Sequence, residues 1–143
     1  MSTKSLLLVV VALTSLSASR TGAPALAPVG QWMIQDQSYK ICIFRENDQL
    51  KASIVWINSK LPQFDVENKN EALRHRQLKG LIISSSIVYQ EETRTWLARD
   101  VYVPSMGDTY DCELSMESPG LMKAEHETLG GLISISRQLR RLK

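Results

Sequence analysis

The sequence has few of the side chains from which metal centres and nucleophilic active sites are built. It contains two histidines, His75 and His126, and two cysteines, Cys42 and Cys112. None of them falls into the His-x-x-x-His or Cys-x-x-Cys spacing that holds a zinc ion. The serines at 84–86 lack the Gly-x-Ser-x-Gly elbow of the hydrolases. We therefore predict a protein that is not an enzyme, with no catalytic residue, no metal ligand and no cofactor.

Long apolar runs are equally scarce, and the one at the N-terminus is too short to cross a membrane as a helix. Lys4 precedes the run Leu6–Leu13, and small or polar residues follow it as far as Ser19. A basic start, a short apolar stretch and a small-residue region are the layout of a secretory signal peptide. We predict that residues 1–27 are a signal peptide cut between 19 and 27, and that 28–143 form one domain. The protein is then exported, either periplasmic or secreted.

The part of the chain after the predicted leader also has no excess of positive or negative charge. The predicted leader carries Lys4 and Arg20, which leaves fifteen basic against fifteen acidic residues in the rest of the chain. A formally neutral domain lacks the basic footprint that general nucleic-acid binding requires, so we predict no nucleic-acid partner. Four basic residues do gather at the C-terminus, and we interpret them as a solvated tail rather than a site for an anionic partner: Arg137, Arg140, Arg141 and Lys143.

What the sequence does contain is a repeated alternation of apolar and polar residues, clearest in the stretch 96–116. In its second half, Tyr110, Cys112, Leu114 and Met116 share one face of an extended chain. This period of two indicates a strand with one face on a core and one face in water. Proline and glycine in the segment 104–107 mark the reversal between two such strands. The stretch therefore predicts a β-hairpin.

Runs of the same kind recur from residue 30 to the end of the chain. They predict eight strands, at 30–35, 39–45, 50–57, 81–89, 96–103, 108–116, 121–128 and 132–139. Most connections have hairpin length, which predicts an all-β fold: an antiparallel up-and-down meander that closes into a small barrel. A two-sheet sandwich is the alternative, because strand spacing does not separate the two.

Two features depart from this rhythm. The charged connection 58–79 is long for a compact domain, has a short helical turn predicted at 71–74, and is interpreted as a rim or lid. In the last strand, Arg137 falls on the apolar side together with Ile133, Ile135 and Leu139.

Several short motifs recur in an order that resembles one family. They are Gly30-x-Trp32, Ile54-Val55-Trp56, Asn68-Lys69-Asn70, Leu73-Arg74, Leu78-x-Gly80-Leu81, Trp96, Tyr102-x-Pro104 and Gly107-x-Thr109-Tyr110. Together they resemble the bacterial domain-of-unknown-function family 2147, and the chain looks like a divergent member of it. Ala52-Ser53 stands where that family usually has a glycine, and the family's C-terminal tryptophan is missing near Ser136-Arg137. The resemblance implies a lipocalin-like β-barrel in the cell envelope, and it carries no assigned activity.

Aromatic side chains spread over several strands are the candidate ligand contacts. An eight-stranded barrel is either just filled by its side chains or holds one small ligand. We predict that such a ligand, apolar or amphipathic, contacts five aromatic residues: Trp32, Trp56, Trp96, Tyr102 and Tyr110. The alternative function is an envelope protein-interaction module with a filled barrel and no ligand.

The two cysteines leave their pairing open. An even number of cysteines in an exported chain favours a disulfide between Cys42 and Cys112. Cys112, however, lies on the apolar face of its strand, whereas Cys42 alternates with Ile41 and Ile43 and shares a face with Lys40. A disulfide and two separate thiols therefore both remain open.

Overall fold

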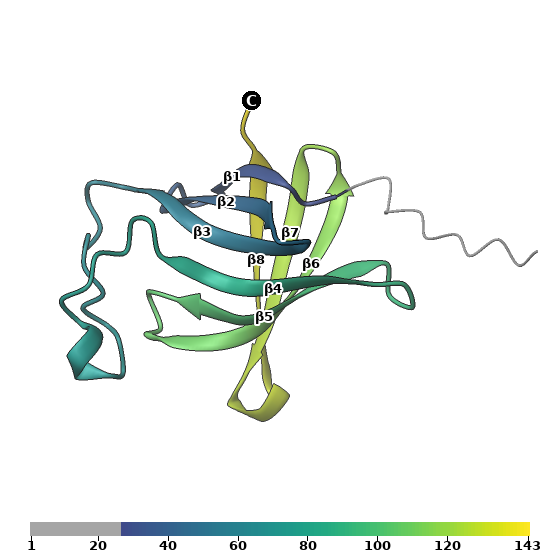
Figure 1. The fold of residues 1–143 in the computed structure, drawn as a ribbon. Coiled ribbons are helices and arrows are strands. Elements are labelled where there is room, and N and C mark those ends of the chain that lie inside the picture. Colours follow the sequence, from purple (N-terminus) through teal and green to yellow (C-terminus); the bar gives the residue numbers. More distant parts are fainter. Residues whose placement is uncertain (1–26) are drawn as a thin grey trace, which may run out of the picture.

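The computed structural model describes residues 27–143 (Figure 1). The signal peptide predicted for residues 1–27 lies, apart from Ala27, outside the described residues. The rest of the chain forms eight strands and two short 3-10 helices. They are β1 (Gly30–Ile34), β2 (Tyr39–Glu46), β3 (Gln49–Ile57), η1 (Glu71–Leu73), β4 (Ile82–Gln90), β5 (Thr95–Val103), β6 (Asp108–Ser118), β7 (Leu121–Thr128), η2 (Leu129–Gly131) and β8 (Ile133–Arg141).

The strands pair in chain order and close into one antiparallel barrel. The closing pair joins the first and last strands, with Trp32 opposite Arg141 and Ile34 opposite Leu139. All eight predicted strands are present, and η1 coincides with the helical turn predicted at 71–74. The predicted meander is therefore confirmed, and closure between β1 and β8 excludes the sandwich.

Alternation decides which side chains fill the barrel. On β2, Ile41 and Ile43 are buried while their neighbours are partly exposed, and on β6 the buried residues are Cys112 and Leu114. Burial of an isoleucine or leucine stabilises a fold by roughly 1.5–3 kcal/mol relative to exposure. The period of two in the sequence is therefore the direct cause of the inward and outward faces of the barrel.

The end of the barrel that holds the β6–β7 turn is closed by Trp32. This side chain is fully buried, and its Nε1 donates a hydrogen bond to the carbonyl oxygen of Pro28 at 2.8 Å. The guanidinium of Arg141 lies 4.4 Å from the centre of the indole ring. Its Nε also donates to the Pro119 carbonyl at 2.7 Å, and its Nη2 to the Ala27 carbonyl at 3.1 Å. The sequence suggested that Arg141 belongs to a solvated tail, but the structure does not bear this out. Arg141 joins the last strand to the start of the domain at Ala27 and to the β6–β7 turn at Pro119.

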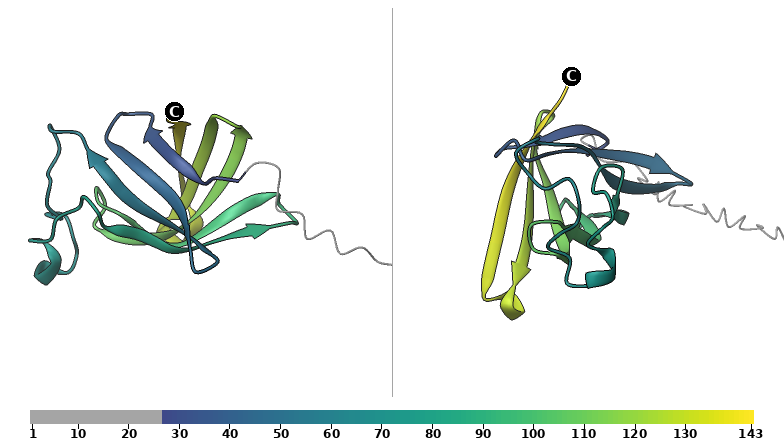
Figure 2. Two further views of the ribbon diagram at one scale, coloured as in Figure 1. Left: turned by 45° about the horizontal axis from the view of Figure 1, so that its top comes forward. Right: turned by 90° about the vertical axis from the view of Figure 1, so that its left-hand side faces the viewer.

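At the opposite end stand the β1–β2 turn, the long connection from β3 to β4, the β5–β6 turn and the η2 hairpin tip. Figure 1 shows the connection, in teal, standing off the barrel, and the right-hand view of Figure 2 places it in front of the strands. This is the end at which the interior is accessible.

Candidate functional site

The barrel interior is not filled. It encloses a cavity of about 270 Å³ to which every strand contributes side chains. Its wall is largely aliphatic and includes Ile34, Ile41, Ile43, Ala52, Ile54, Ile83, Ile87, Ala98, Val101, Leu114, Met122, Ala124 and Leu139. At about 30 Å³ for each water molecule in the liquid, the volume corresponds to roughly nine water-sized groups. The cavity is therefore large enough for a short aliphatic molecule.

Small side chains at inward positions account for this space. Ala52, Ala98 and Ala124 lie on three different strands and all line the cavity. Ala52 and Ala98 are buried, so their short side chains leave volume that a leucine or phenylalanine would occupy. An eight-stranded barrel is narrow enough for such single choices to decide whether its interior is open or filled.

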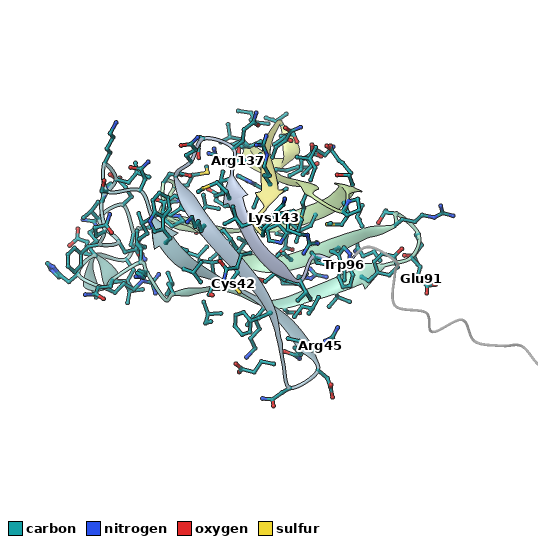
Figure 3. All side chains as sticks on the ribbon, turned by 90° about the horizontal axis from the view of Figure 1, so that it is seen from above. Cys42, Arg45, Glu91, Trp96, Arg137 and Lys143 are labelled. Atoms are coloured by element: carbon teal, nitrogen blue, oxygen red, sulfur yellow. The ribbon has the colours of Figure 1, made fainter. Side chains whose placement is uncertain are left out.

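Of the five aromatic residues predicted to contact a ligand, only Tyr102 lines the cavity. Trp32 closes the far end, as described above. Trp96 on β5 is buried against Tyr89, with ring centres 5.1 Å apart (Figure 3). Tyr110 lies outside the lining and packs on His126 at 4.7 Å between ring centres. The wall of the cavity is thus aliphatic where the sequence led us to expect aromatic rings, and ligand contact at these residues stays a prediction.

The position of Trp56 has a specific cause. The sequence places it on one face with Leu50, Ala52 and Ile54, but the pairing of β2 with β3 shifts register between Lys40 and Ile41. Lys40 is opposite Trp56, whereas Ile41 is opposite Ile54, so one extra residue stands on β3. Such a bulge reverses the faces beyond it. Trp56 accordingly lies with Lys40, whose Nζ is 5.1 Å from the ring centre, and not in the cavity.

The two cysteines are both free. Cys112 is buried and lines the cavity, whereas Cys42 is partly exposed on β2, between the inward residues Ile41 and Ile43 (Figure 3). A disulfide requires Cβ atoms that face each other at short range. The alternation of β2 points Cys42 away from the interior, so of the two alternatives the structure has separate thiols.

The buried titratable groups of the wall are uncharged near neutral pH. Burial, followed by the nearby Asp111, raises the pKa of Cys112 to about 12. Burial and a hydrogen bond to Asp65 likewise raise the pKa of Tyr102 to about 12. Burial, and then the positive charge of Arg137, lower the pKa of His126 below its ordinary value of 6.5. All three groups are therefore neutral at pH 7.

His126 is the least satisfied of these groups. The residue is 6% exposed and lines the cavity, and within residues 27–143 its Nε2 has no hydrogen-bond partner. Buried polar atoms are rarely left unpaired, so this atom requires an explanation. Arg137 on β8 also lines the cavity (Figure 3), and its Nη1 lies 3.5 Å from Oδ2 of Asp36. Together these residues give an aliphatic cavity a polar mouth.

The sequence carried a signal for both residues. His126 has the same strand parity as the inward residues Met122 and Ala124, and Arg137 has that of Leu139. A histidine on an inward face is expensive to bury unless it has a use, whereas Arg137 stays exposed at the mouth of the cavity. Arg137, which the sequence grouped with a solvated tail, is exposed but also lines the mouth of the cavity.

The long connection is held to the barrel by one buried carboxylate. Asp65 is 1% exposed and accepts hydrogen bonds from Asn68 Nδ2 at 2.7 Å, from Arg76 Nε at 2.8 Å and from the Tyr102 hydroxyl. Because Tyr102 is a cavity residue, this cluster couples the connection to the wall of the site. The residues 58–79 are thus a fixed rim in this structure.

A second attachment joins the same connection to the β5–β6 turn. Gly107 has a φ of +65°, and a Cβ at this position would lie 1.7 Å from the carbonyl oxygen of Glu67. The backbone N–H of Lys69 donates to the Gly107 carbonyl at 3.1 Å, and its Nζ pairs with Asp108. Several motifs behind the family resemblance therefore hold the rim in place.

The rim also forms a second, smaller space beside the mouth. This pocket of about 240 Å³ lies between the connection and the barrel and is partly lined by Phe64, Val66 and Leu78. It shares four residues with the main cavity: Tyr39, Leu61, Pro104 and Ser105. The two spaces therefore adjoin at the mouth.

Neither a metal centre nor a membrane helix is found in the part of the chain that the structure describes. Among residues 27–143, no three or more His, Cys, Asp or Glu side chains gather as metal ligands would. Within the same residues, no helix has the length and apolar character needed to span a bilayer.

Comparison with known proteins gives a matching family and a solved structure of the same fold. A family described as uncharacterized proteins conserved in bacteria, DUF2147, matches residues 30–141. The solved structure of protein HP1028 from Helicobacter pylori, described as belonging to the lipocalin family, aligns with a TM-score of 0.66 and 19% identity. The alignment covers 82% of this chain and 84% of that one, so the fold is lipocalin-like. No curated protein matches the chain significantly.

Proposed function

This chain belongs to the DUF2147 family of uncharacterized proteins conserved in bacteria, and we propose that its barrel binds a small apolar or amphipathic ligand without catalysing a reaction. The observation that carries the proposal is the cavity of about 270 Å³ with an aliphatic wall and a few polar groups at its mouth. Small-molecule sites are concave and mostly apolar, with a small number of placed polar groups.

The energetic cost of the cavity supports this function. Apolar cavities left in protein cores reduce stability by about 24 cal/mol per Å³, so an interior of this size forgoes at most several kcal/mol of packing. Larger side chains at Ala52, Ala98 or Ala124 would recover part of that loss. Ligand binding would explain why the barrel keeps a cavity that lowers its stability.

We also propose that the protein acts in the cell envelope. The basis is the N-terminal sequence, with Lys4, the apolar run 6–13 and the small residues that follow. The family's occurrence in bacteria is consistent with a periplasmic or secreted protein.

The alternative function, an envelope module that binds a protein partner, has one observation in its favour. The tip between β7 and β8 exposes three large apolar side chains: Leu129, Leu132 and Ile133. That hypothesis, however, assumed a filled barrel. The open interior therefore makes ligand binding the better supported of the two functions.

Native mass spectrometry of the protein purified without reduction, with organic extraction of any bound molecule, tests the proposal. We expect a co-purifying small lipid-like mass, or binding of 1-octanol by calorimetry if the purified protein has lost its ligand. The variant Ala98→Phe should fill the cavity and abolish binding. Ala72→Phe, the same change at an exposed position on η1, is the matched control and should bind normally.

The folded state of each variant is checked by circular dichroism, so that a loss of binding is not confused with a loss of fold. If the folded Ala98→Phe variant binds as well as the control, the ligand does not occupy the barrel interior. If the wild-type protein binds nothing of this size, the proposal fails, and the exposed tip becomes the place to look for a partner.

A further inference from the structure

The unpaired atom in the cavity and the basic residue beside it belong to neighbouring strands. His126 lies on β7 and Arg137 on β8, and both line the cavity. Around His126, the charged or titratable groups are Tyr110 and Cys112 on β6 and Arg137 on β8, with Asp36 and Tyr39 across the mouth. Of these groups, only Arg137 and Asp36 carry a charge at the mouth near neutral pH.

We propose that His126 and Arg137 form the headgroup subsite of the cavity and bind the carboxylate of a short aliphatic acid. The inference rests on the proposed function, because it assumes that the aliphatic wall holds the hydrocarbon chain. A carboxylate at this position accepts hydrogen bonds from the guanidinium of Arg137 and, once the His126 ring rotates to turn its buried Nε2 into the cavity, from that atom as well. It thereby gives the one unpaired buried side-chain atom of residues 27–143 a partner.

The pair between Arg137 and Asp36 does not prevent this. Both side chains are about half exposed, and their atoms are 3.5 Å apart, which is long for a charge-assisted hydrogen bond. Exposed pairs of this kind contribute little to stability. A guanidinium has five N–H donors, so Arg137 has donors to spare for a ligand while it remains near Asp36.

The electrostatics of the site favour an anion over a cation. The positive charge of Arg137 reaches into the cavity, since it lowers the pKa of His126 in addition to the effect of burial. The charge that acts on His126 is thus positive, and a positive charge beside a neutral imidazole attracts a negative headgroup rather than a cationic one. A monocarboxylate matches the single positive charge of Arg137, whereas a phosphate dianion would bring a second negative charge close to Asp36.

The size of the cavity limits the length of the acid. A volume of about 270 Å³ takes roughly nine groups of about 30 Å³. We therefore choose octanoate as the probe, with 1-octanol and octylamine as neutral and cationic molecules of the same chain length.

Isothermal titration calorimetry of the three probes at pH 7.5 provides the test. We expect octanoate to bind at least tenfold more tightly than 1-octanol or octylamine. Arg137→Gln should abolish this preference while 1-octanol still binds. Arg140→Gln, which removes the same charge from an exposed position three residues away, is the matched control and should keep it.

A second measurement does not depend on any variant. In the wild-type protein, octanoate should raise the pKa of His126, followed by NMR titration of its ring, by about one unit or more, because a carboxylate stabilises the imidazolium. 1-Octanol should leave that pKa where it is. The exposed His75 is the internal reference in the same spectra.

The outcomes distinguish the two proposals. Equal binding of octanoate and 1-octanol, a preference for octylamine, or an unchanged His126 pKa with octanoate bound would each overturn the carboxylate subsite and leave the proposed function standing. Binding of none of the three probes would overturn both.

Discussion

At the scale of single residues, burial decides the chemistry of this protein. Tyr102, Cys112 and His126 all face the cavity and all are held in their neutral forms by desolvation. For the tyrosine and the cysteine, a raised pKa means that the protonated form is favoured by folding. This contribution to stability is fully present below their unfolded pKa values and is lost as the pH rises toward 12.

The first prediction concerns the two thiols. At pH 7.5, we expect one thiol of the folded protein, that of Cys42, to react with a thiol reagent, and two after denaturation. The reason is that the thiolate is the reactive species, and burial raises the pKa of Cys112 to about 12. Cys42→Ser should remove the fast reaction and leave the denatured protein with one reactive thiol. Mass-spectrometric counting of the modified thiols is the measurement.

A disulfide would give a different pattern. In that case neither thiol reacts, even in denaturant, until a reductant is added. Equal and fast reaction of both thiols in the folded protein would contradict the buried position of Cys112.

At the scale of elements, the connection from β3 to β4 is rich in charged residues, as mobile loops often are. Its side chains nevertheless make hydrogen bonds that hold it against the barrel. Its charged residues suggested a lid or rim, but Asp65 within it is buried and is bound by three donors. A loop held in this way keeps the mouth of the cavity in one shape. The rim is therefore expected to depend more on this buried carboxylate than on its exposed attachment through Lys69 and Asp108.

The second prediction tests that dependence. Asp65→Ala should lower the free energy of unfolding by about 2–4 kcal/mol, because it leaves the Tyr102 hydroxyl, Asn68 and Arg76 without their acceptor. Urea denaturation is the measurement, with Asp108→Ala as a control that removes an exposed carboxylate and costs less. Tyr102→Phe keeps the ring in the wall and should fall between the two. An Asp65→Ala variant as stable as the control would mean that the rim is held in another way.

At the scale of the whole molecule, the ends of the domain meet at one side chain. Arg141 on the last strand packs on Trp32 of the first and donates to carbonyl groups before β1 and in the β6–β7 turn. Closure of the barrel depends on these contacts of Arg141, because β1 is only five residues long and pairs with β8 through three residue pairs. The contacts of Arg141 therefore stabilise the closure itself.

The third prediction follows from the geometry of the guanidinium. Arg141→Lys should reduce the free energy of unfolding by about 1–3 kcal/mol, because an ammonium does not reproduce several hydrogen bonds in one plane together with stacking on the indole. Arg140→Lys, at the exposed neighbouring position, should change it little. Chemical denaturation followed by tryptophan fluorescence reports both values. If the two variants have the same stability, the last strand does not close the barrel through Arg141.

Local patterns were sufficient to predict the fold but not all the faces of its strands. Alternation predicted the strands and the closed meander because each inward position must be apolar for the barrel to bury a core. It placed Trp56 inward, however, since one extra residue on β3 shifts the register in a way that only the partner strand reveals. It also left the cysteines open, because whether two thiols meet depends on strands far apart in the chain.

The sequence by itself determined that this protein is built from eight strands, because a period of two is a property of neighbouring residues, whereas the pairing of β1 with β8 decided for a barrel over a sandwich. Only the tertiary structure decided that the barrel is hollow, since the cavity results from Ala52, Ala98 and Ala124 standing together on different strands. The same holds for the cavity mouth, where Asp65 meets Tyr102 and Arg137 lies near His126. The sequence does show that His126 and Arg137 break the apolar pattern. What they can bind follows from the space that they share, and strand pairing creates that space.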